Sequence, residues 1–150
     1  MLALTKATGY AILALGYLEC QGSEQVISTR EIAERFAIPG ELLAKVLQRL
    51  SRQGLLEAHQ GRGGGYSLAR STEDISVGEV IEAVEGPIAI AVCLKDGGRD
   101  LCELFENCTI RSPVGHIQSK LTELFDSIMI ADIASGIQFP PCAEPLSGTR

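Results

Sequence analysis

The chain of 150 residues lacks several features that would point to an enzyme or a membrane protein. Its only two histidines are His59 and His116, and neither belongs to a paired acid–base set or a nucleophile motif. No apolar run approaches the ~18 residues of a transmembrane helix, and the N-terminus lacks the charged start and cleavage site of a signal peptide. These absences argue against catalysis and predict a cytoplasmic protein.

The formal net charge of -6 is divided unevenly along the chain. Residues 1–72 contain eight Lys and Arg against six Asp and Glu, which leaves +2. Residues 73–150 contain five against thirteen, which leaves -8. The first half therefore carries the positive charge that a nucleic-acid partner requires.

Residues 28–52 have the pattern of two helices joined by a turn. Ser28, followed three positions later by Glu31, is a capping-box pattern that predicts a helix over about 29–36, and Pro39-Gly40 ends it. From residue 41 the apolar side chains fall on one helical face: Leu43, Val46, Leu47 and Leu50. The other face carries charged and amide side chains of the kinds that read base edges in a major groove, namely Glu41, Lys45, Gln48, Arg49 and Arg52.

Two short extended runs follow at 55–58 and 66–69, joined by a glycine-rich stretch at 60–65. This pattern predicts a β-hairpin, or wing. Glycine permits positive φ and close approach, so the hairpin is expected to lie against a phosphate or in a minor groove through Arg62, Gly63, Gly64 and Tyr66. The stretch lacks the Lys-Ser/Thr ending of a phosphate-binding P-loop. A winged helix-turn-helix that binds double-stranded DNA is the favoured interpretation; the alternative is a solvated basic face beside a loose loop.

Two further helices complete the expected domain, which spans residues 1–86. Thr5 can cap a first helix, and Ser76 with Glu79 forms a second capping-box pattern at the start of a short helix that Gly86-Pro87 ends. The predicted fold class is mainly α with a small β-wing, followed by a long C-terminal dimerisation helix.

Residues 87–111 contain three of the five cysteines, Cys93, Cys102 and Cys108. Three is an odd number for disulfides, and in a reducing compartment such a group is more typical of a metal or redox site. Thiolates bind both iron–sulfur clusters and zinc, and no CxxC pair chooses between them. The spacing therefore leaves an iron–sulfur cluster, zinc or another metal, and unligated thiols as alternatives.

Residues 112–135 have the pattern of a dimerisation helix region. Ser112-Pro113 is a helix opening, and apolar residues then alternate steps of three and four at Val114, Ile117, Leu121, Leu124 and Ile128. A homodimer would place two reading helices on the half-sites of a near-palindromic operator. The alternative is that the helix packs only on its own subunit. Residues 136–150 contain three prolines and are expected to form an irregular tail.

In order and spacing, these elements resemble the Rrf2 family of bacterial winged-helix transcription regulators, some of which bind iron–sulfur clusters. The resemblance covers nearly the whole chain. It rests on Leu4-Thr5-Lys6, Tyr10-Ala11, Ile32-Ala33, the stretch 47–56 with Gly54, the wing 63–69, the helix 81–86, the three later cysteines and Ile130-Ala131-Asp132.

The resemblance implies a homodimeric regulator, such as a repressor, that senses iron–sulfur status or redox or nitrosative stress through a [2Fe–2S] or [4Fe–4S] cluster. Carried over by position, Cys93, Cys102 and Cys108 would be its thiolate ligands. Arg111 stands where one branch has a histidine ligand, so the fourth position falls to His116, a nearby carboxylate, Cys142 or an exogenous ligand. The alternatives are a winged-helix regulator without a cluster, using thiols, a small molecule or structural zinc, and a protein-interaction module that does not bind DNA.

Overall fold

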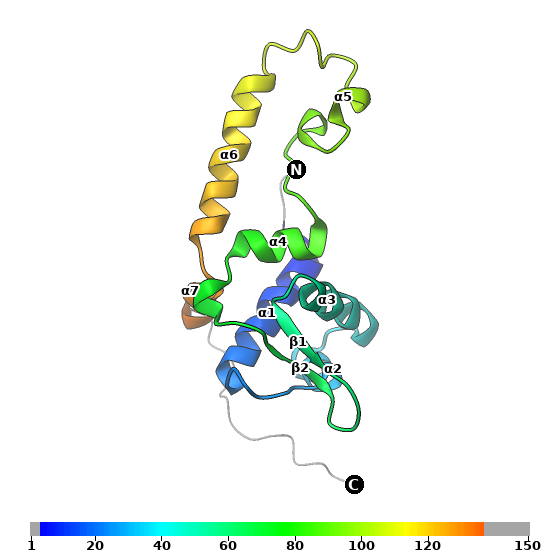
Figure 1. Cartoon of the computed structure of the whole chain (residues 1–150), viewed down its shortest axis with the longest axis vertical. Helices are drawn as coiled ribbons and strands as arrows, with labels where there is room; N and C mark the ends of the chain where they lie inside the picture. The colour runs from blue at the N-terminus through cyan, green and yellow to red at the C-terminus, as the bar shows by residue number, and fades with distance from the viewer. Residues whose placement is uncertain (1–3, 137–150) are drawn as a thin grey trace.

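The computed structural model describes residues 4–136, so the tail expected over 136–150 and Cys142 lie almost wholly outside the described residues. The elements follow in the order α1 (Lys6–Gln21), α2 (Thr29–Phe36), α3 (Gly40–Arg52), β1 (Leu56–His59), β2 (Gly65–Leu68), η1 (Thr72–Asp74), α4 (Val77–Glu85), η2 (Val92–Leu94), α5 (Gly98–Leu101), α6 (Arg111–Ser127) and α7 (Ile130–Gly136). The predicted fold class is confirmed: the chain is mainly helical with a small antiparallel hairpin (Figure 1).

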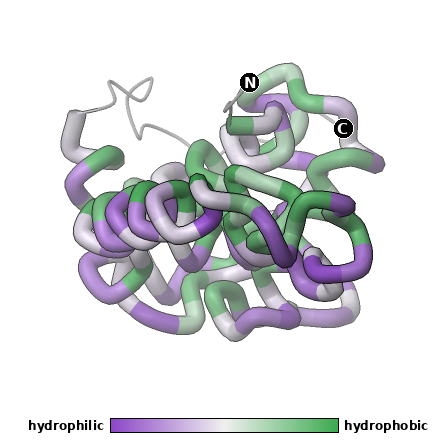
Figure 2. The backbone as a smooth tube through the Cα atoms, turned by 90° about the horizontal axis from the view of Figure 1, so that it is seen from above, coloured by the Kyte–Doolittle hydropathy of each residue, from purple (hydrophilic) through white to green (hydrophobic). Residues whose placement is uncertain are grey.

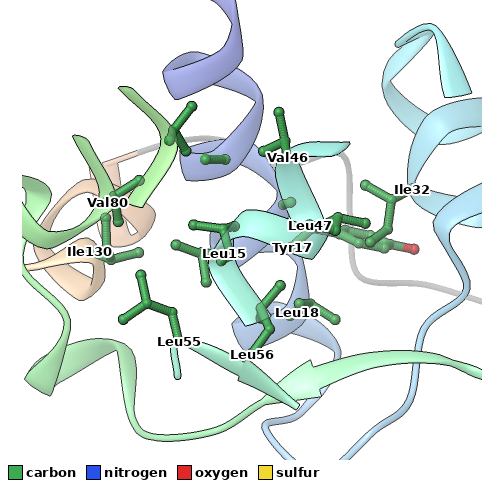
Figure 3. Close-up of a cluster of buried hydrophobic side chains, with 14 of the residues drawn as sticks. Leu15, Tyr17, Leu18, Ile32, Val46, Leu47, Leu55, Leu56, Val80 and Ile130 are labelled. Atoms are coloured by element: carbon green, nitrogen blue, oxygen red, sulfur yellow. The ribbon is translucent and has the colours of Figure 1, made fainter. Parts of the chain in front are cut away.

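Helix α1 forms the centre of the core. Its N-terminus is capped by Thr5, whose hydroxyl oxygen accepts a 3.3 Å hydrogen bond from the Thr8 amide. Leu15 and Leu18 are fully buried, and side chains of α2, α3, β1 and α4 surround them in Figure 3. This core fixes the helices that carry the candidate interface.

Helices α2 and α3 form the predicted helix-turn-helix. The Ser28 hydroxyl accepts a 3.1 Å hydrogen bond from the Glu31 amide, as the sequence pattern predicts. The other capping-box bond, from the Ser28 amide to the Glu31 side chain, was predicted wrongly. The Glu31 carboxylate accepts a 3.1 Å hydrogen bond from the Tyr17 hydroxyl of α1 instead. Ala37 ends α2 in the left-handed conformation, with φ of 52°. The apolar face predicted for α3 is buried in full.

The wing pairs β1 with β2 in an antiparallel register that places Leu56 opposite Leu68 and His59 opposite Gly65. Both strands lie within one residue of the predicted runs. The sequence did not indicate one further pairing with the wing: Ile27 exchanges two 2.9 Å backbone hydrogen bonds with Tyr66. The wing is therefore joined to the segment that enters α2.

Helix α4 begins with a complete capping box. Its reciprocal hydrogen bonds join Ser76 and Glu79 at 3.2 and 2.9 Å. Partial burial acts to raise the pKa of Glu79, but the 2.5 Å ion pair with Arg70 and the bonds to Ser76 outweigh it, so the pKa lies below its ordinary value. The helix ends at Gly86, whose φ is 88°.

From α4 the chain runs through η2 and α5 to the far end of the molecule and returns along α6 (Figure 1). We call this excursion, residues 87–127, the arm. Within it, the Ile90 amide donates a 3.1 Å hydrogen bond to the Gln118 side chain. Helix α6 begins at Arg111, one residue before the expected cap. The predicted apolar seam is wrong at its last position, because Ile128 lies beyond the helix and its carbonyl accepts a 2.8 Å hydrogen bond from the Val77 amide.

Helix α7 returns the chain to the winged body. Ile130 is fully buried in the common core, and its amide donates a 2.8 Å hydrogen bond to the Ile75 carbonyl. Hydrophobic and hydrophilic residues alternate along the helical turns in Figure 2, as expected for helices with one buried face. Among residues 4–136, no helix combines the length and apolar character needed to cross a bilayer.

Candidate nucleic-acid interface

The outer face of α3 is open to solvent. Five of the nine residues predicted to contact DNA lie on this helix, and all five are exposed: Glu41, Lys45, Gln48, Arg49 and Arg52. All of them except Arg49 lie near the centre of the outer face. The buried leucine and valine side chains on the opposite face hold the helix on α1, so the outer face has a fixed orientation. Lys and Arg can donate to guanine edges or phosphates, and Gln can bind adenine.

Arg49 differs from the other four. With about 100° of rotation per residue, its position lies about 70° from the centre of the outer face. Its Nη1 atom donates a hydrogen bond to the Val84 carbonyl in the last turn of α4. One guanidinium nitrogen of this exposed side chain is therefore bonded to the protein itself.

The glycines of the wing have two separate roles. Gly61 and Gly63 have φ of 97° and 73°, values that L side chains rarely adopt. Gly64 and Gly65 lie against the chain's own backbone: a Cβ at Gly64 would come within 2.5 Å of the His59 carbonyl oxygen. The glycine run thus shapes the tight turn that presents the exposed Arg62 at the tip.

The wing base is held by polar contacts. His59 Nε2 lies 2.8 Å from the buried Ser67 hydroxyl, across the two strands. Tyr66 is half-buried, and its backbone is held by Ile27. A hollow of about 350 Å³ separates the wing from the start of α2, and its lining includes Thr29, Gln60, Gly61, Gly64 and Tyr66. The predicted wing residues therefore lie on one hydrogen-bonded hairpin; their contact with DNA stays a prediction.

The three predicted cysteine ligands occupy different turns of the segment between α4 and α6. Cys93 lies in η2, Cys102 directly follows α5, and Cys108 lies shortly before α6. All three are half-buried free thiols. His116 is exposed on α6. Across residues 4–136, no three His, Cys, Asp or Glu side chains come together as a metal site requires.

The same segment is held in its present shape by contacts that do not involve sulfur. Arg99 forms a 2.7 Å ion pair with Glu106. Arg111 donates a 3.3 Å hydrogen bond to the Phe105 carbonyl, and its guanidinium carbon lies 4.3 Å from the centre of the Phe105 ring. Arg111, at the position where one branch of the resembled family has histidine, therefore closes the loop.

The donor set fits an iron–sulfur cluster chemically, since it offers three thiols on one irregular segment. Their present positions do not form a ready-made site. Ligands of structural metals are often assembled only on binding, so holding a cluster would require this segment to draw its sulfur atoms together.

Comparison with known proteins matches residues 4–136 to the Rrf2 family model, described as an iron-dependent transcriptional regulator. The HTH-type transcriptional regulator NsrR of Bacillus subtilis is 29% identical over 130 residues, which cover 87% of this chain and 88% of that protein.

Two solved structures share the fold. CymR, the global cysteine regulator of B. subtilis, has a TM-score of 0.70 and 25% identity, covering 92% of this chain and all of that one. IscR of T. potens has a TM-score of 0.67 and 26% identity, covering 90% and 88%. The chain therefore belongs to the Rrf2 family and is a DNA-binding transcriptional regulator, not an enzyme.

Proposed function

We propose that the protein is a homodimeric regulator, acting in the cytoplasm as a repressor, whose paired α3 helices bind a near-palindromic operator. In this proposal a cluster held by Cys93, Cys102 and Cys108 reports iron–sulfur status or redox or nitrosative stress. The observation that carries the proposal is the exposed face of α3, packed on the core beside a hydrogen-bonded wing with Arg62 at its tip.

Within the DNA complex, the residues divide into two groups. In this proposal, Lys45, Gln48 and Arg52 enter the major groove from the centre of the exposed α3 face. Arg62 would contact the backbone or the minor groove from the wing. Such charged contacts release counterions, so affinity should fall steeply with salt.

Dimerisation is supported by the apolar stripe on α6. Ile117 and Leu124, one heptad apart, are 52% and 53% exposed. No residue of α6 is fully buried within the subunit, and Phe125 is the residue of this helix that packs against the core. A second copy of α6 would cover this stripe through the a/d positions of a short coiled coil. The α3 helices of the two subunits would then have a fixed separation, which a palindromic site requires.

The sensory part of the proposal rests on the position of the cysteines. They lie on the part of the arm that joins α4 to α6, the proposed dimer helix. A change in this segment can therefore alter the relative placement of the two α3 helices. When bound, an iron–sulfur cluster supplies a redox-active iron that reacts with oxygen or nitric oxide. If the cluster binds one dimer geometry more tightly than the other, linkage requires DNA affinity to change by the same factor. Such coupling free energies are typically ~1–3 kcal/mol.

The DNA-binding part is tested by selecting an operator from random duplexes with the full-length protein and titrating binding against salt. Lys45→Gln and Arg62→Gln should each reduce the slope of log K against log salt by about 0.9 if one phosphate contact is lost. Lys95→Gln, on the cysteine segment, is the charge-matched control and should leave the slope unchanged. A weak, salt-independent interaction would favour the protein-interaction module.

The cluster is tested separately by anaerobic purification, absorption spectroscopy, and iron and sulfide assays. The expected result is a coloured protein that is bleached when Cys93, Cys102 or Cys108 is changed to Ser. A cluster that survives all three changes would contradict the ligand assignment.

A regulator without a cluster is the second candidate, favoured by the separation of the three free thiols. It predicts a colourless anaerobic protein that binds the operator normally. One zinc per subunit without iron or sulfide would instead indicate a structural zinc site.

A further inference from the structure

The last turn of α4 is held by two other helices immediately before the cysteine segment begins. On one side, Arg49 of α3 donates a hydrogen bond to the Val84 carbonyl. On the other, one carboxylate oxygen of Glu85 accepts hydrogen bonds from the backbone and hydroxyl of Thr5 and from the Thr8 hydroxyl, at the start of α1. We call these contacts the α4 junction.

The Arg49 contact supplies what the end of α4 requires. The last carbonyls of a helix lack partners within the helix and carry partial negative charge, so a guanidinium is a favourable partner there. The Glu82 carbonyl is already occupied by the Gly86 amide at 3.0 Å. Arg49 donates to the Val84 carbonyl, two residues further along the same helix end.

The location of Arg49 agrees with this role. It lines a hollow of about 340 Å³ between the C-terminal ends of α3 and α4, together with Arg52, Glu82, Val84 and Gly86. Of the two arginines, Arg49 is the one that bonds to the Val84 carbonyl. Lys45 lies near the centre of the outer face of α3 and does not line this hollow. Two cationic residues on one helix thus lie in different surroundings.

We propose that Arg49 is a positioning residue rather than a DNA contact, and that it couples the shape of the cysteine segment to the placement of α3. Gly86 and Pro87 follow the junction directly, so displacement of the segment acts on the turn to which Arg49 is bonded. This proposal rests on the proposed function for its effect on DNA, but the clamp itself does not depend on DNA or a cluster.

The clamp is tested by hydrogen exchange of the full-length protein. Arg49→Gln should accelerate exchange about tenfold in peptides covering residues 84–88, because a hydrogen bond to a charged donor is lost. Lys45→Gln removes the same charge from the same helix and should leave this region unchanged. Equal exchange in wild type and Arg49→Gln would overturn the clamp. If Arg49→Gln fails to fold, Arg49→Lys tests the clamp instead. It retains the charge and should increase the exchange rate of the same peptides by a smaller factor, and an unchanged rate would overturn the clamp.

The assignment against DNA contact is tested by salt titration on the selected operator. Arg49→Gln should weaken binding by a similar factor at every salt concentration, whereas Arg62→Gln, at the wing tip, should reduce the salt slope by about 0.9. A reduced slope for Arg49→Gln would make Arg49 a phosphate contact and overturn the assignment. If the wild type binds no DNA, the proposed function fails, while the exchange experiment still decides the clamp.

The coupling is tested by perturbing the segment without touching a cysteine. A Cβ at Gly98 would lie 2.6 Å from the Val92 carbonyl oxygen and 2.7 Å from the Cys93 carbonyl carbon, so Gly98→Ala must shift this part of the loop. Gly98→Ala should change operator affinity at least fivefold in wild type and less than twofold in Arg49→Gln. Equal effects in the two backgrounds, or no effect in wild type, would overturn the coupling.

Discussion

The Tyr17 hydroxyl of α1 donates a 3.1 Å hydrogen bond to the Glu31 carboxylate in the first turn of α2. The ring of Tyr17 also packs edge-on against Phe36 at the other end of α2, with 5.5 Å between centroids. Burial raises the pKa of Tyr17, and the hydrogen bond and charge of Glu31 raise it further. One side chain therefore holds both ends of α2 against the core helix.

We expect Tyr17→Phe to lower the free energy of unfolding by about 1–2 kcal/mol, because the ring packing remains while a hydrogen bond to a charged acceptor is lost. Tyr10→Phe, at a half-buried position on the same helix, is the control and should change stability by less than about 0.5 kcal/mol. Urea denaturation of the two variants measures the difference. Equal stability of Tyr17→Phe and wild type would show that the hydrogen bond contributes nothing.

The α4 junction predicts a pH dependence. Partial burial acts to raise the pKa of Glu85, but hydrogen bonds from Thr8 and Thr5 outweigh it and lower the pKa below its ordinary value of 4.5. A lowered folded-state pKa gives stability that is present above pH 4.5 and is lost as the pH falls through the folded-state value. Glu85→Gln should therefore be less stable than wild type at pH 7, and the difference should shrink below pH 4.5.

Thermal unfolding at pH 7 and at successive values below 4.5 measures this effect. Glu82→Gln, on the exposed side of the same helix, should not reproduce the pH-dependent difference. A stability gap for Glu85→Gln that stays constant as the pH falls would contradict the ionised-carboxylate explanation.

Gly65 in the wing and Gly9 in α1 form a matched pair for substitution. A Cβ at Gly65 would overlap the Ile27 carbonyl oxygen and lie 2.5 Å from the carbonyl carbon, whereas a Cβ at Gly9 in α1 would meet no atom within 4 Å. Gly65→Ala should destabilise the protein by about 1–3 kcal/mol through backbone displacement. Gly9→Ala should stabilise it by about 0.5–1 kcal/mol, since alanine favours helix. Chemical denaturation checks both signs, and a harmless Gly65→Ala would contradict the close approach.

The exposed stripe on α6 predicts the effect of a charge at its centre. Ile117→Glu should shift the protein from dimer to monomer in sedimentation velocity, because two buried carboxylates would face one another across the proposed interface. Ser119→Glu, on the other face of the same helix, should leave the assembly unchanged. A dimer that persists in Ile117→Glu would place the subunit contact elsewhere.

The winged domain was predictable because its signals are local. Apolar residues repeat at helical spacing in α3 and α4, and Ser28 and Ser76 mark the helix starts that the structure contains. The hairpin followed from its glycine-rich turn. The Ile27 pairing was not predicted, because a single bridged residue shows no alternation of apolar and polar side chains. The β-branched pair Val26-Ile27 is the one sequence feature that favours extended backbone there.

The candidate site was less predictable, because a helical pattern gives the direction of a side chain but not its partner. Arg49 has the sequence character of a DNA contact, and only the tertiary structure brings it to the Val84 carbonyl. Ile128 continued a heptad repeat in the sequence, yet its backbone pairs with Val77 and ends the helix. The short turns around Cys93 and Cys102 have no periodicity that could have indicated them.

Ile130 gives the architecture a practical consequence. Because this residue fills the core after the chain has travelled out along the arm and back, a fragment that stops at Gly86 would leave Ile75 and α1 with an open gap. The two ends of the arm, at Gly86 and at Ile128, both contact the winged domain. An engineered replacement of residues 87–127 should therefore retain the residues that follow them, because Ile128 and Ile130 complete the core contacts.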